Sequence, residues 1–167
     1  MKTAFNQAQF FDGLETITQA IANGQQPQSK FILDFLALLD ISKTTLNDIK
    51  SQNTRTNIAK HPELGEVALK QKIYFKPVGK DDGDLLSDSG LTASEQLENA
   101  LQTLKTDPLI KTHKICIIIV TDFQTLLAYD VKTDDTLDVE FVELDKDYAF
   151  FLPLVGLERA KDFSEHP

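Results

Sequence analysis

Glutamate and lysine side chains between positions 63 and 76 are the residues whose types fit a catalytic site best. Magnesium-dependent nucleases place a glutamate and a lysine two residues apart on one strand, so that the carboxylate holds the metal and the amine orients water. In this chain Glu63 and Glu66 precede Lys70 and Lys76. These four residues form the candidate catalytic set, with Glu63 and Glu66 as the candidate Mg²⁺ ligands.

The spacing within this set departs from the nuclease pattern. Ala68 stands two residues before Lys70, and Tyr74 stands two residues before Lys76, so no Glu-x-Lys motif occurs here. Two interpretations remain open for the alternating stretch from 66 to 76. It is either a divergent nuclease site built from the candidate set, or an ordinary strand whose polar side meets water. The second interpretation is favoured.

Other residues with metal-binding or nucleophilic chemistry have simpler explanations. Asp122 and Asp130 flank an expected strand, and aspartate is favoured in turns because its side chain bonds nearby backbone amides. Cys116 lies inside the apolar run from Ile115 to Val120, which is the most hydrophobic of the expected strands, so we expect a buried and inert thiol. It is the only cysteine, which excludes a disulfide within the chain and a zinc site built from several cysteines.

Length and composition fit a single globular domain over residues 1–167. The chain is 41% hydrophobic and 26% charged, which is ordinary for a folded soluble protein. No secretory signal or membrane-spanning run is recognisable, so we expect a cytoplasmic protein without a membrane partner. The formal net charge of −9 disfavours nucleic-acid binding by this region alone, because it repels a phosphate backbone at long range.

Periodicity predicts an α+β fold, with N-terminal helices followed by a small mixed β-sheet. Apolar residues at helical spacing predict helices over 5–22, 30–41 and 43–50, and a further helix after Thr92. Alternating or unbroken apolar stretches predict strands over 66–76, 115–120, 125–131 and 137–141. We expect an acidic surface loop over 78–90 and a buried, irregular segment over 148–157, before a polar end.

Four segments carry a family resemblance: 72–77 (KIYFKP), 107–110 (DPLI), 120–130 (VTDFQTLLAYD) and 150–160 (FFLPLVGLERA). In this order they resemble the N-terminal region of large bacterial type IIG restriction-modification proteins. In that family an endonuclease and an adenine-specific DNA methyltransferase share one chain. The resemblance covers most of the sequence.

The resemblance implies a restriction-endonuclease-like fold, here degenerate because the Glu-x-Lys motif is missing. It implies that the natural chain continues past Pro167 into a methyltransferase domain, and that DNA is the partner of the full-length protein. S-adenosylmethionine would bind only that downstream domain, and Mg²⁺ would be needed only if the nuclease site is active. The module is then structural or a divergent nuclease. The alternative is a stand-alone acidic domain without enzymatic activity that binds a protein partner through its helical half.

Overall fold

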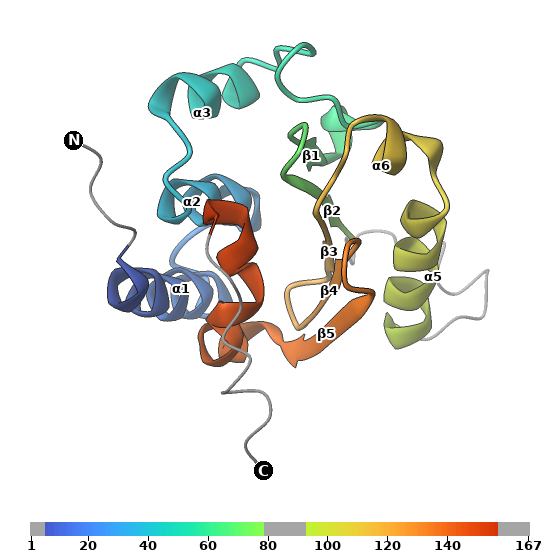
Figure 1. Cartoon of the computed structure of the whole chain (residues 1–167). Helices are drawn as coiled ribbons and strands as arrows, with labels where there is room; N and C mark the ends of the chain where they lie inside the picture. Colours follow the sequence, from blue (N-terminus) through green and yellow to red (C-terminus); the bar gives the residue numbers. More distant parts are fainter. Residues whose placement is uncertain (1–5, 79–92, 157–167) are drawn as a thin grey trace.

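A five-stranded mixed sheet lies between two groups of helices (Figure 1). The computed structural model describes residues 6–78 and 93–156. The strands follow the order β1-β2-β3-β4-β5, and each neighbouring pair is antiparallel except β2 and β3, which are parallel. The prediction of an α+β fold with helices first and a mixed sheet after them is confirmed.

The sheet and the helices have the following bounds. The strands are β1 (Val67–Ala68), β2 (Ile73–Pro77), β3 (Ile117–Thr121), β4 (Thr125–Asp130) and β5 (Asp135–Glu140). The α-helices are α1 (Gln7–Ala22), α2 (Phe31–Leu38), α3 (Lys43–Lys50), α5 (Ala93–Lys105) and α6 (Pro108–Thr112). The 3₁₀ segments of the described residues are η1 (Gln28–Lys30), η2 (Pro62–Leu64) and η4 (Phe141–Val155). No helix within the described ranges combines the length and apolar character needed to cross a bilayer.

The N-terminal helices begin where side chains can satisfy their first backbone amides. Asn6 accepts a hydrogen bond from the backbone of Gln9 at the start of α1, and Ser42 accepts one from Thr45 at the start of α3. All three predicted N-terminal helices are present, with ends shifted by a few residues. Their apolar stripes turn inward, as the spacing predicts.

One face of the sheet packs against α1, α2 and η4 through aromatic side chains. Phe31 of α2 is fully buried and is the centre of this layer. Its ring contacts four others, which come from the same helix, from β2, from the β3–β4 turn and from the start of η4: Phe35, Phe75, Phe123 and Phe141. These contacts bind the N-terminal helices to the sheet.

The opposite face of the sheet packs against α5 and α6. Leu97, Leu101 and Leu104 form one stripe of α5, and they share a core with Ile118 and Val120 of β3. The intervening residues Ile117 and Ile119 belong to the aromatic layer on the other face. The unbroken apolar run therefore becomes a strand covered on both faces, as predicted.

The prediction of one continuous strand over 66–76 is wrong. The chain reverses at Lys70 and Gln71, where Gln71 has a φ of 65°, and the two halves pair as the antiparallel strands β1 and β2. Leu69 closes the turn by donating its backbone amide to the carbonyl of Ile73 at 2.9 Å. On both sides of the turn the odd-numbered residues face the aromatic layer and the even-numbered residues face α5. The hairpin therefore has the same alternating sequence pattern as a single strand.

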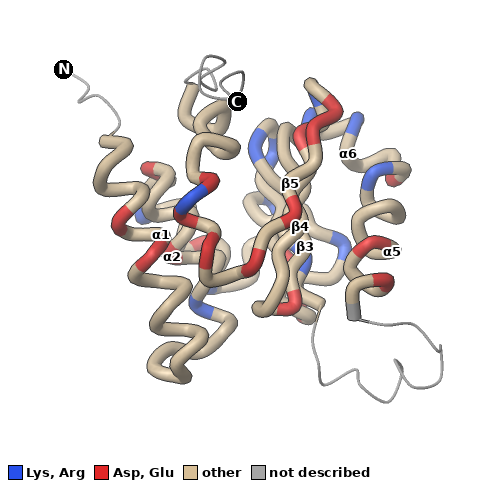
Figure 2. The backbone as a smooth tube through the Cα atoms, turned by 90° about the horizontal axis from the view of Figure 1, so that it is seen from below, with Lys and Arg blue, Asp and Glu red and all other residues tan. Residues whose placement is uncertain are grey.

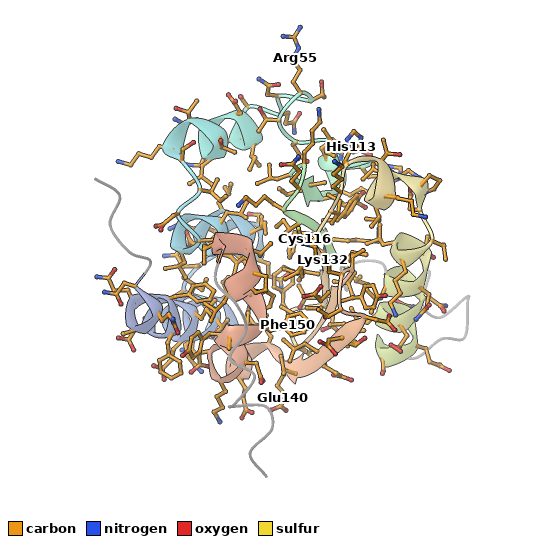
Figure 3. The ribbon with its side chains drawn as sticks, in the orientation of Figure 1. Arg55, His113, Cys116, Lys132, Glu140 and Phe150 are labelled. Carbon is orange, nitrogen blue, oxygen red and sulfur yellow. The ribbon has the colours of Figure 1, made fainter. Side chains whose placement is uncertain are left out.

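Two smaller expectations also need correction. Cys116 precedes β3 and is only half-buried, because the strand begins two residues later than the apolar run; its position is labelled in Figure 3. The segment expected to be irregular is mostly 3₁₀ helix through Val155, although its predicted burial is confirmed at Phe151 and Leu154. Residues 79–90 of the predicted loop, Thr92 and the polar end after 156 lie outside the described residues.

Candidate functional site

The β1–β2 hairpin places Glu66 beside Lys76. Val67 lies opposite Phe75 in the antiparallel pairing, so the next residues outward, Glu66 and Lys76, face each other. Glu66 Oε2 lies 2.9 Å from Lys76 Nζ, and the Glu66 residue is only 2% exposed. Glu66 and Lys76, which lack the Glu-x-Lys spacing in the sequence, therefore form an ion pair across the hairpin.

Tyr74 is the third side chain of this site. It stands two residues before Lys76, the position that the glutamate occupies in a Glu-x-Lys motif. Its hydroxyl donates to Glu66 Oε1 at 2.5 Å and accepts from the backbone amide of Lys60 at 3.0 Å. Burial raises the pKa of Tyr74 well above its ordinary value, and the hydrogen bond to Glu66 raises it further. Tyr74 is therefore a neutral hydrogen-bond donor at any physiological pH.

The segment before β1 supplies one more donor to Glu66, and a buried asparagine holds this segment in place. The backbone amide of His61 donates to Glu66 Oε1 at 3.3 Å. Asn57 accepts from the backbone amides of Ala59 and Ala68, and it donates to the backbone carbonyl of Glu66. These bonds replace a missing strand partner along the outer edge of β1.

A pocket of about 280 Å³ opens between this hairpin and α5. Its polar wall includes a second ion pair, in which Lys60 Nζ lies 2.6 Å from Asp107 Oδ2. The hydrogen bond from Lys60, followed by one from the backbone of Leu109, lowers the pKa of Asp107 below its ordinary value. Each lysine in the pocket is therefore paired with a carboxylate. The complete lining is Lys60, His61, Glu66, Tyr74, Lys76, Asn99, Ala100, Thr103, Leu104 and Asp107.

Two of the four candidate catalytic residues lie apart from this pair. Glu63 belongs to the exposed η2 segment, where its carboxylate lies 3.4 Å from His61 Nδ1. Lys70 is exposed in the turn of the hairpin. The described residues contain no group of three or more His, Cys, Asp or Glu side chains that could hold a metal ion.

Sequence reasoning missed several contributors to the site, among them Lys60, Asn57 and Tyr74. A usable signal existed for Tyr74 alone, because it precedes Lys76 by two residues as the glutamate of Glu-x-Lys would. The other two lie in a polar stretch without periodicity. Their roles depend on the path of the chain back toward β1.

The aspartates at the strand ends are turn residues, as expected. Asp122 accepts from the backbone amides of Gln124 and Thr125, and Asp130 accepts from those of Lys132 and Thr133. All four bonds are local, which is typical of aspartate in a turn. They explain the two aspartates as supports of the hairpins around β4.

Comparison with known proteins identifies the family of this chain. The family model described as "MmeI, N-terminal domain" matches residues 6–167. The chain belongs to the MmeI N-terminal domain family. Within the curated proteins, DNA methyltransferase A of Bacillus subtilis (strain 168) is 32% identical over 143 residues. No solved structure matches the chain.

Membership in the MmeI N-terminal domain family confirms the resemblance to the N-terminal region of type IIG restriction-modification proteins. The matched residues cover 86% of this chain but only 14% of the Bacillus subtilis relative. The family therefore describes a domain-sized region, to which the chain corresponds over nearly its whole length.

Proposed function

We propose that this chain is a non-catalytic N-terminal module of a DNA restriction-modification or DNA methyltransferase protein, in which a nuclease-like centre is closed by its own side chains. The observation that carries the proposal is the full pairing of Glu66. Its Oε2 bonds Lys76, and its Oε1 accepts from Tyr74 and from the backbone of His61. Family membership and the methyltransferase relative support the protein context.

The chemistry of this centre argues against magnesium-dependent cleavage. Mg²⁺ in phosphoryl-transfer sites is held by one or two carboxylates that keep free oxygen lone pairs. Here Tyr74 offers a neutral hydroxyl in place of a second carboxylate, and the ammonium of Lys76 already neutralises Glu66. A metal ion would have to displace the Lys76 ammonium and the Tyr74 hydroxyl from a carboxylate that is almost completely buried.

The implied partners belong to the whole protein. A methyltransferase domain would bind S-adenosylmethionine and carry out methylation, and DNA would be held by surfaces other than this acidic domain. The net charge of −9 supports this assignment of DNA binding to other surfaces, because a negatively charged module repels the phosphate backbone of DNA. A cytoplasmic location follows from this proposed context.

A cleavage assay tests the proposal. We expect the 167-residue chain to leave supercoiled plasmid DNA intact with Mg²⁺ or Mn²⁺, at protein concentrations in excess of the DNA. Glu66→Gln is the matched control, because it preserves the shape of the site and removes the carboxylate at its centre. Cleavage by the natural chain that disappears in Glu66→Gln would contradict the proposal. Equal cleavage by both proteins would come from a source other than the Glu66 carboxylate, such as a contaminating nuclease, and would not contradict a closed Glu66 centre.

A further inference from the structure

Asp145 is a buried carboxylate that the Glu66 site does not use. It lies in η4 and is only 6% exposed. Within the described residues, no hydrogen-bond donor or basic side chain pairs with its carboxylate, whereas the buried Asp122 and Asp130 both accept hydrogen bonds from backbone amides. A buried charge without donors is costly, so it persists only where something else compensates it.

Further acidic residues lie near Asp145 in η4 and on the neighbouring helix α1. Glu143 and Asp147 flank it in η4, and the charges of Asp145 and Glu143 both contribute to a raised pKa of Asp147, after the larger effect of burial. The α1 helix packs along η4, and Tyr148 joins the two by contacting the rings of Phe10 and Phe11. The acidic face is defined as Asp12 and Glu15 of α1 with Glu143, Asp145 and Asp147 of η4.

Among the residues that the structure describes in α1 and η4, Lys146 carries the single positive charge. Lys146 lies 3.5 Å from Glu143, and it is largely exposed. Figure 2 shows the acidic positions of α1 beside those of the segment that follows β5. The face therefore presents four more negative than positive charges on the side of the sheet opposite the Glu66 pocket.

We propose that the acidic face binds an arginine-rich segment of a protein partner, with one guanidinium covering the carboxylate of Asp145. Arginine fits better than lysine because its guanidinium is more weakly hydrated and offers several donors to a desolvated carboxylate. A metal ion fits less well, because no cluster of three acidic ligands forms within the described residues. DNA is repelled by this charge. The inference is independent of whether the Glu66 centre is closed.

The test is a titration of the 167-residue chain with hexa-arginine, followed by backbone amide NMR, with hexa-lysine and duplex DNA as comparison probes. Hexa-arginine should shift amides of η4 near residue 145 and of the facing turns of α1. Asp145→Asn should weaken this binding by about tenfold, the effect of losing one charge-assisted hydrogen bond. Glu98→Gln is the control, since it removes the same charge from an exposed position of α5 on the other face of the sheet. It should change binding by less than about twofold.

Equal weakening by the two variants, equal binding of hexa-lysine, or shifts confined to other elements would overturn the proposal. A thermal melt supplies a second readout that needs no ligand. Asp145→Asn should melt within about 2 °C of the natural chain or above it, because it removes a buried charge that has no partner in the described residues. A clear fall in melting temperature would show that the carboxylate has a structural partner, and would also overturn the proposal.

Discussion

Replacing Glu66 with alanine should lower the free energy of unfolding by about 3 kcal/mol. The change removes the acceptor for three donors: the ammonium of Lys76, the hydroxyl of Tyr74 and the backbone amide of His61. Lys76 is only 30% exposed, so its charge would be left partly desolvated without a partner. Urea denaturation at neutral pH, followed by circular dichroism, measures the effect.

Glu63→Ala is the matched control for this measurement. It removes the same side chain three residues earlier, but from an exposed position, and should change the unfolding free energy by less than about 0.5 kcal/mol. A second substitution, Lys76→Met, should recover part of the loss when combined with Glu66→Ala, since it removes the unpaired charge. If Glu66→Ala costs no more than Glu63→Ala, the Glu66 site is not a structural element.

Asp107 should contribute to stability in two separable ways. Its carboxylate caps α6 by accepting from the amide of Leu109, and it pairs with Lys60 on the wall of the pocket. Asp107→Ala removes both interactions and should cost about 1 to 2 kcal/mol. Asp107→Asn keeps a capping oxygen and loses only the ion pair, so it should cost about half as much. Thermal or urea unfolding of both variants separates the two effects.

The ion-pair contribution of Asp107 should depend on pH with a definite sign. Its pKa is lowered in the folded state, chiefly by Lys60, so the unfolded chain binds a proton more readily than the folded one. The stabilisation is therefore fully present above the ordinary aspartate pKa and is lost as pH falls through the folded value. The difference between the natural chain and Asp107→Asn should be constant near neutral pH and vanish in acid. A difference that grows in acid would contradict this assignment.

Much of the fold is predictable because its elements have unambiguous local patterns. The N-terminal helices combine side-chain caps with an apolar stripe, and β3 is a β-branched run too apolar for an exposed strand. The β1–β2 hairpin was not predictable, because its turn keeps the alternation in phase and contains neither glycine nor proline. The structure shows the reversal by the positive φ of Gln71 and by the antiparallel pairing of β1 with β2.

The candidate site was predictable in its residue types but not in its arrangement. Glu66 and Lys76 stand ten residues apart, and only the hairpin makes them neighbours. Glu63 and Lys70 share the chemistry of that pair, yet neither belongs to it, because one lies in η2 and the other in the exposed turn. The contribution of Lys60 through its backbone amide leaves no trace in the sequence, since any residue type could donate that bond.

Paramagnetic broadening by Mn²⁺ tests the closed centre most directly. Mn²⁺ bound at Glu66 would broaden the amide signals of β1 and β2 most strongly, because paramagnetic broadening falls steeply with distance from the ion. We expect the signals of Glu66, Tyr74 and Lys76 to stay sharp at Mn²⁺ concentrations that broaden exposed acidic positions such as Glu143. Selective broadening around Glu66 that is lost in Glu66→Gln would show that the centre binds metal, and would contradict the account of a site closed by Lys76 and Tyr74.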